Sequence, residues 1–181
     1  TVSDRMGIDK LTKWADTFGL SSKTGIELPG EVTSHVANQQ VLYDNTKEIN
    51  GGQLNSKPYL VRLSVEKQLK KYGLMRGVTY TDEQVERCAT RIVQLVGSST
   101  NIGPQIRSIM REELDIPEST SYARRWHQEI NSILYEITWN RVQTILTGIG
   151  QSVTAVTPIA VARYISAIAN GGNVYEASII K

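Results

Sequence analysis

The sequence has little of what metal, redox and disulfide sites require. Its 181 residues include one cysteine and two histidines. Cys88 has no second cysteine to pair with, which excludes an internal disulfide and a cysteine-based metal cluster. His35 and His127 are too few and too far apart in the chain to indicate a histidine metal site. We therefore expect no metal and no cofactor, and we expect Cys88 to lie in a core.

Long apolar runs and long basic runs are also missing. No span approaches the ~18 apolar residues that a membrane helix needs, so no membrane segment is expected within the chain. The formal net charge is only +2, and no run of five lysines or arginines occurs, which argues against nucleic-acid binding and against a polybasic membrane segment. The Gly-x-Gly at 148–150 is not followed by Gly-Lys-Ser/Thr, so a phosphate-binding loop has no support.

Helical periodicity is present over most of the chain. Apolar residues recur at spacings of three and four and are punctuated by glycine and proline. This pattern predicts helices over 8–18, 56–73, 81–97, 104–114, 119–146 and 158–169. Thr81 and Gln84 have the spacing of a capping box, and Thr157 followed by Pro158 marks the start of the last helix.

Two other segments lack this periodicity. Residues 32–55 are dominated by polar residues and glycine, and we predict an irregular surface segment there. Residues 173–181 are predicted to begin a strand. Because no segment of comparable strength could pair with this strand, we expect the partner sheet to lie outside the chain.

Two passages, read together, resemble the transpeptidase domain of penicillin-binding proteins. The first runs from Gly7 to Leu20 and continues as Lys23-Thr24-Gly25-Ile26-Glu27-Leu28-Pro29-Gly30-Glu31. The second comprises Gly150-Gln151-Ser152-Val153-Thr154, Thr157-Pro158 and Ile168-Ala169-Asn170-Gly171-Gly172. In that family the first passage follows the second active-site motif and the second leads toward the third. Both occur here in the family's order.

The resemblance implies a mainly α-helical part of the α/β serine transpeptidase fold, which is similar to that of β-lactamases, with a short terminal strand. Residues 1–31 and 148–181 would be parts of the transpeptidase domain, and residues 32–147 would be an inserted helical bundle. Such insertions are carried by some class B, monofunctional members of Gram-positive bacteria. The helices at 8–18 and 158–169 are expected to pack together and to leave part of the 159–168 face exposed.

The resemblance also implies serine acyl transfer in peptidoglycan cross-linking. A serine attacks the D-Ala-D-Ala end of a stem peptide, releases D-alanine and passes the acyl group to an amine, and β-lactams acylate the same serine. The parent protein would act on the extracytoplasmic face of the cell membrane, with its anchor outside this chain. Its partners would be the stem peptide, β-lactams and, further, cell-wall or division proteins. The fragment itself is expected to be soluble.

The chemistry needs Ser-x-x-Lys, Ser-x-Asn and Lys-Thr/Ser-Gly, and look-alikes of all three occur here. They are Ser64 with Lys67, Ser99 with Asn101, and Lys23-Thr24-Gly25. Ser64 is predicted in mid-helix, whereas an activated serine gains from a helix N-terminus and a pocket. Ser99 and Asn101 are explained by loop and capping chemistry. Lys23-Thr24-Gly25 comes before the other two and matches a different family passage. We interpret all three as non-catalytic.

The true motifs are expected before Thr1 and after Lys181. The chain alone is therefore expected to have no acylation activity. A loop of Gly150, Gln151, Ser152 and Thr154 is predicted to lie near the active site of the intact enzyme. A purely structural role for this loop stays open.

Two other functions also stay open. The helices at 56–146 could form a module that binds a cell-wall synthesis or division protein. Its anchors would be Tyr122, Trp126, Tyr135 and Trp139, although aromatic residues at helical spacing are more often core. The second is an unrelated soluble helical regulator, which an upstream Ser-x-x-Lys and a downstream Lys-Thr/Ser-Gly in the reading frame would exclude.

Overall fold

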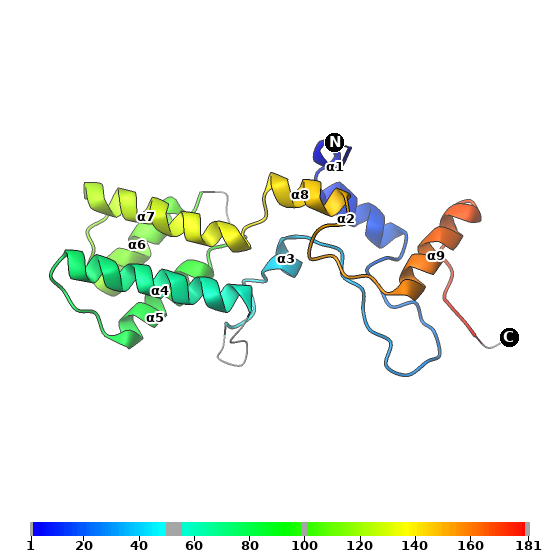
Figure 1. Ribbon diagram of the computed structural model, residues 1–181, viewed down its shortest axis with the longest axis horizontal. Helices are drawn as coiled ribbons and strands as arrows, with labels where there is room; N and C mark the ends of the chain where they lie inside the picture. Colours follow the sequence, from blue (N-terminus) through cyan, green and yellow to red (C-terminus); the bar gives the residue numbers. More distant parts are fainter. Residues whose placement is uncertain (1, 50–55, 99–100, 180–181) are drawn as a thin grey trace. The chain divides into compact units, whose positions relative to one another are not determined.

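The structure, a computed structural model, describes residues 2–49, 56–98 and 101–179. Its regular elements in these residues are helices, and the chain divides into two compact units (Figure 1). One unit comprises the segments Thr1–Leu42 and Trp139–Lys181, and the other comprises Tyr43–Thr138. The second unit is thus continuous in sequence, whereas the first is assembled from the two ends of the chain.

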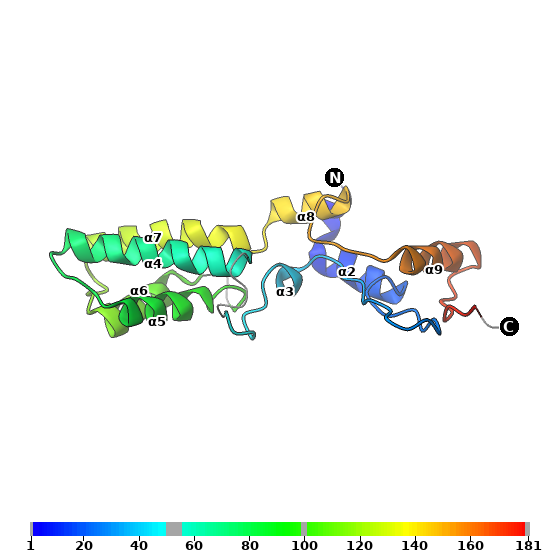
Figure 2. The ribbon, with the colours of Figure 1, turned by 60° about the horizontal axis from the view of Figure 1, so that its bottom comes forward.

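The unit Tyr43–Thr138 is a helical bundle. It contains α4 (Lys57–Met75), α5 (Asp82–Val93), α6 (Gly103–Leu114), α7 (Ser121–Leu134) and the 3-10 helix η2 (Tyr135–Ile137). Helix α4 packs against α5 and α7, and α6 packs against the same two helices. The bundle therefore has two layers, α4 with α7 and α5 with α6, which Figure 2 shows one above the other.

The space between these helices is filled by apolar side chains. Side chains with no exposed area come from all four helices and include Val65, Leu69, Ile92, Ile106, Met110, Ile130 and Leu134. Tyr72 of α4 stacks on Trp126 of α7, with ring centroids 4.3 Å apart and planes 10° apart. Cys88 lies in this core, as expected, and burial raises the pKa of its thiol to about 12. The bundle thus has a hydrophobic core of its own.

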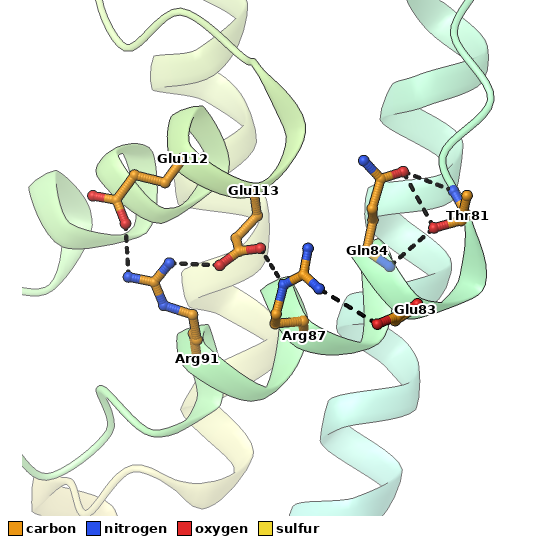
Figure 3. A network of polar contacts seen from close by, with 7 residues as sticks. All are labelled: Thr81, Glu83, Gln84, Arg87, Arg91, Glu112 and Glu113. Carbon is orange, nitrogen blue, oxygen red and sulfur yellow. Dashed lines mark hydrogen bonds and ion pairs between the residues drawn. The ribbon is translucent and has the colours of Figure 1, made fainter.

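Capping side chains begin α4, α5 and α7 of the bundle near the residues that the sequence predicts. The Thr81 hydroxyl accepts a hydrogen bond from the Gln84 backbone N–H, and the Gln84 side chain accepts one from the Thr81 N–H at 3.0 Å, which confirms the capping box (Figure 3). Ser56 caps α4 and Thr120 caps α7 in the same way. The predicted helices at 56–73, 81–97 and 104–114 are confirmed, with the second ending earlier, at Val93.

A group of charged side chains joins α5 to α6 (Figure 3). One carboxylate oxygen of Glu113 accepts from Arg87 Nε at 2.6 Å and the other from Arg91 Nη1 at 2.6 Å. Arg91 also donates to Glu112 at 2.7 Å. The hydrogen bonds from Arg87 and then Arg91 hold the pKa of Glu113 below its usual value. This ionised carboxylate stabilises the bundle above the pKa of the unfolded state, and that contribution is lost as pH falls.

We expect Glu113→Gln to flatten the acidic pH dependence of the free energy of unfolding. The wild-type protein loses the contribution as pH falls below the ordinary glutamate value of 4.5, whereas the variant has no carboxylate to protonate. Because both arginines are partly exposed, the loss at pH 7 is about 1 kcal/mol. Urea unfolding at neutral and acidic pH measures it. Glu136→Gln, at an exposed position, is the control, and an equal pH slope in Glu113→Gln and the wild type would contradict this account.

The other unit is built from α1 (Val2–Met6), α2 (Ile8–Thr17), α3 (Gln39–Leu42), α8 (Arg141–Gly148) and α9 (Pro158–Ala169). Helix α1 packs against α2 and α8. A bidentate ion pair joins α8 to α1: Arg141 donates to both carboxylate oxygens of Asp4, at 2.6 Å each. The Phe18 ring meets Tyr164 of α9 edge-on at 5.6 Å. The helices predicted over 8–18 and 158–169 therefore form, and the contact between Phe18 and Tyr164 joins them.

The face of α9 that was expected to be exposed is open. Ile165 and Ile168 each retain 57% of their surface. The start of α9 is also as predicted, because Thr157 accepts from the Ala160 N–H at 3.3 Å and Pro158 occupies the first helical turn.

The prediction of one long helix over 119–146 is wrong. The structure divides this stretch into α7, η2 and α8. Thr138 is extended, and Asn140 begins α8 by accepting a hydrogen bond from the Gln143 N–H at 3.1 Å. The Trp139 backbone N–H donates to the Gln39 side chain at 2.7 Å. The helix is therefore interrupted by the Asn140 cap and by the hydrogen bond to Gln39, although the apolar spacing of the sequence continues through this point.

The strand predicted at the end of the chain does not form within residues 173–179, and residues 180 and 181 lie outside the described part. The Ala177 N–H donates to the Thr24 carbonyl at 2.9 Å. The Ser178 hydroxyl and the Ile179 N–H both donate to Glu27. Residues 177–179 are therefore held by individual hydrogen bonds to Thr24 and Glu27 and not by pairing in a sheet.

The prediction for residues 32–55 also needs correction. Ser34, Val36 and Ala37 are buried, with exposed fractions of 2%, 9% and 0%. Ser34, Val36 and Ala37 therefore belong to the interior of their unit, whereas His35 is exposed, and residues 39–42 form α3. The other described residues of 32–49 are irregular, as predicted. The positions at 50–55 lie outside the described residues.

Candidate functional site

The loop of Gly150, Gln151, Ser152 and Thr154 connects α8 to α9. Gly150 has a positive φ of 79°, a conformation that favours glycine. The Gln151 N–H donates to the Leu146 carbonyl at 2.9 Å, and the Gln151 side chain is exposed. The Ser152 hydroxyl donates to Thr154 Oγ1 at 2.9 Å and accepts from the Thr154 N–H at 3.1 Å. The loop is thus tied internally through two of its hydroxyls.

Residues 34–37 hold this loop from the other side. The backbones of His35 and Ala155 exchange two hydrogen bonds of 2.7 and 2.8 Å. Thr154 Oγ1 accepts from the buried Ala37 N–H at 3.0 Å, and the Thr157 N–H donates to the Ser34 hydroxyl at 2.9 Å. Thr154 therefore positions the backbone, while the Gln151 side chain extends from a loop that is fixed at its base.

Lys23-Thr24-Gly25 lies in an irregular segment and not on a strand. Thr24 is only 1% exposed. Its backbone N–H and its hydroxyl both donate to the same oxygen of Glu31, at 2.6 and 2.7 Å. The hydrogen bond from the Thr24 hydroxyl, followed by that from its N–H, lowers the pKa of Glu31. The carboxylate of Glu31 thus occupies both donors of Thr24.

Arg163 of α9 binds the backbone of residues 19–23. Its guanidinium donates to the Lys23 carbonyl at 3.0 Å, to the Ser22 hydroxyl at 2.9 Å and to the Gly19 carbonyl. Gly19 has a φ of 74°, and a Cβ there would lie 2.7 Å from the guanidinium. Sequence reasoning assigned no role to Arg163 or Glu31. The signal for Arg163 is that it is a lone basic residue in an otherwise small and apolar helix.

Ser64 and Lys67 lie on an exposed side of α4 in the bundle. The Ser64 hydroxyl donates to the Leu60 carbonyl one turn back, at 2.9 Å. Ser64 is therefore in mid-helix, as expected. Asn101 is exposed at the residues preceding α6, and Ser99 lies outside the described residues.

An open, largely apolar pocket of about 430 Å³ lies between α2 and α9. Its lining residues include Leu11, Trp14, Phe18, Val156, Val161 and Tyr164. No carboxylate, imidazole or amine is among the lining side chains. The pocket therefore offers apolar contact and no group for acid–base chemistry near neutral pH.

The described part of the chain contains no group of three or more histidine, cysteine, aspartate or glutamate residues placed to hold a metal ion. No helix among these residues has the length and apolar composition needed to cross a membrane.

The four aromatic residues considered as interface anchors differ in exposure. Trp126 is 3% exposed and belongs to the bundle core. Tyr122 is 36% exposed and rests against Trp126, with centroids 4.6 Å apart. Trp139 is half-buried and donates its indole N–H to Thr144 at 3.0 Å. Of the four, Tyr135 has the largest free surface, at 56%.

The comparisons with known proteins bear on the family. A model of the penicillin binding protein transpeptidase domain matches residues 1–121 and 119–181, which together cover the whole chain. Searches of curated proteins and of solved structures found no match. The match includes both passages that resemble the family, and the structure places those passages in one compact unit. The chain therefore belongs to the penicillin-binding protein transpeptidase domain family.

Proposed function

We propose that this chain is part of a peptidoglycan D,D-transpeptidase whose nucleophilic serine lies outside these 181 residues. The observation that carries the proposal is the family match along the whole chain. In such an enzyme, serine acyl transfer acts on the stem peptide, and β-lactams acylate the same serine. The extracytoplasmic location and the anchor outside this chain belong to the same proposal.

The environments of the look-alike motifs support their non-catalytic role. Ser64 donates within its own helix to the Leu60 carbonyl, and both Ser64 and Lys67 are exposed. The donors of Thr24 are occupied by Glu31. Asn101 belongs to the bundle, whereas Thr24 belongs to the other unit. An activated serine needs a base and oxyanion donors directed at one point, and these residues do not supply them.

We further propose that the bundle is an insertion into the transpeptidase domain, of the kind found in class B, monofunctional enzymes of Gram-positive bacteria. The unit Tyr43–Thr138 is continuous in sequence and has its own core. Both family passages lie in the flanking segments of the other unit. A segment with these properties can be added to a domain at a surface loop with little change to its host.

Labelling with a fluorescent penicillin tests the proposed activity. We expect the full-length protein to form a stoichiometric adduct that survives denaturation, because the acyl-enzyme is covalent. The 181-residue chain alone should form none. A full-length protein that fails to label while folded, or a chain that labels by itself, would contradict the proposal.

The loop after α8 is proposed to border the active site through Gln151. We expect Gln151→Ala in the full-length protein to slow penicillin acylation by about tenfold, because a positioning contact is lost, with no change in melting temperature. Gln128→Ala, at an exposed position of α7, is the matched control. Stopped-flow acylation measures both. An unchanged rate in Gln151→Ala would make the loop a scaffold only.

A further inference from the structure

Helix α4 carries apolar side chains on two sides. Val61, Val65, Leu69 and Tyr72 are buried in the bundle. On the opposite side lies a row of exposed residues, which we call the α4 stripe: Lys57, Leu60, Leu63, Lys67, Lys71, Leu74 and Met75. Leu60, Leu74 and Met75 retain 48%, 75% and 57% of their surface. A helix that is apolar on both sides normally has a second contact.

The charges of the stripe are of one sign. Lys57, Lys67 and Lys71 take part in no ion pair found among the described residues. The one acidic residue of α4 is Glu66, which pairs with Arg62 at 2.8 Å on the bundle side. The stripe therefore presents leucines together with lysines whose charge is not neutralised, and a complementary partner must be anionic.

The positions of the lysines argue against a helical protein partner. Positions 60, 64, 67, 71 and 74 are exposed, follow the spacing of a coiled-coil seam and hold Leu, Ser, Lys, Lys and Leu. A facing helix would bury ammonium groups at the centre of that seam, which is costly even when they are paired. At a lipid–water interface, by contrast, the lysine stems lie along the apolar surface while the ammonium groups reach phosphates.

We propose that the α4 stripe binds the surface of a bilayer that contains anionic phospholipid. The leucines and Met75 enter the boundary between headgroups and acyl chains, and the three lysines contact lipid phosphates. The 19 residues of α4 form a rod of about 28 Å, long enough to lie along the surface with the whole stripe engaged. This surface is separate from acyl transfer, so it stands whether or not the proposed activity does.

Vesicle co-sedimentation of the 181-residue chain tests the proposal. We expect binding to vesicles of phosphatidylcholine with about one-third phosphatidylglycerol, little binding to pure phosphatidylcholine, and weakening as salt rises. Lys67→Gln/Lys71→Gln should lower the partition coefficient by about 30-fold. Lys10→Gln/Lys13→Gln removes the same charge from exposed positions of α2 and is the matched control, with a change below about threefold expected.

A second variant separates lipid binding from simple attraction to anions. Leu60→Gln/Leu74→Gln keeps every charge and should weaken vesicle binding by about tenfold, with an unchanged circular dichroism melting curve. Equal losses in the two lysine pairs would overturn the proposal. Equal binding of the wild-type chain to neutral and anionic vesicles would also overturn it. So would binding to inorganic polyphosphate that is as strong as binding to vesicles and is unchanged in Leu60→Gln/Leu74→Gln. Self-association of the chain that Leu60→Gln/Leu74→Gln abolishes would instead identify a second copy as the partner.

Discussion

Trp126→Ala is expected to lower the free energy of unfolding of the helical bundle by about 3–5 kcal/mol. The indole is 3% exposed, stacks on Tyr72 at 4.3 Å and touches Tyr122. Its backbone carbonyl accepts from the Tyr72 hydroxyl at 3.2 Å, which fixes the ring pair across α4 and α7. Truncation leaves a cavity at the main contact between these helices. Urea unfolding followed by far-ultraviolet circular dichroism measures the loss.

Tyr135→Ala in the same unit is the matched control. Tyr135 is also a large aromatic residue but is 56% exposed, so its truncation should cost only about 0.5 kcal/mol. If the two variants lose similar stability, the stacked pair of Tyr72 and Trp126 is not part of the core and the packing described for the bundle is wrong.

Glu31→Ala is expected to destabilise the segment 23–31 locally, because two hydrogen bonds to a charged acceptor are lost. Thr24 is 1% exposed, and both its N–H and its hydroxyl donate to one oxygen of Glu31. Removing the carboxylate leaves two buried donors without their acceptor. Hydrogen exchange at the Thr24 amide measures the local loss, as protection that falls by about tenfold or more.

Glu31→Gln provides the control, because it keeps the shape and an acceptor oxygen but removes the charge. Its loss of protection should be intermediate. In the wild-type protein, the lowered pKa of Glu31 predicts that this segment is stable above the ordinary glutamate value of 4.5 and weakens as pH falls below it. Unchanged protection in Glu31→Ala would show that the carboxylate does not hold this segment.

Elements with local signals could be predicted from the sequence. The capping box of Thr81 and Gln84, and Thr157 followed by Pro158, each act within one helical turn, so spacing alone reveals them. The division of 119–146 was missed because apolar spacing runs through Asn140. Its capping bond is local, but the bond from Trp139 to Gln39 joins residues far apart in sequence. No single-sequence pattern reports such a contact.

The candidate site shows the same limit more strongly. The loop containing Gln151 was recognised by resemblance, but its attachment to residues 34–37 was not, because those residues look like an irregular segment. The order of Lys23-Thr24-Gly25 in the chain already argues against a catalytic role, but the sequence does not reveal that Glu31 accepts both donors of Thr24. A motif therefore acquires its chemical meaning from the side chains that the fold brings to it.

The most direct test of the account is to locate the acylated serine. The full-length protein and its Ser64→Ala variant would be reacted with penicillin, digested and mapped by mass spectrometry. We predict one adduct, on a serine outside these 181 residues and followed three positions later by lysine, with equal labelling of the two proteins. An adduct on Ser64 that disappears in Ser64→Ala would contradict the account.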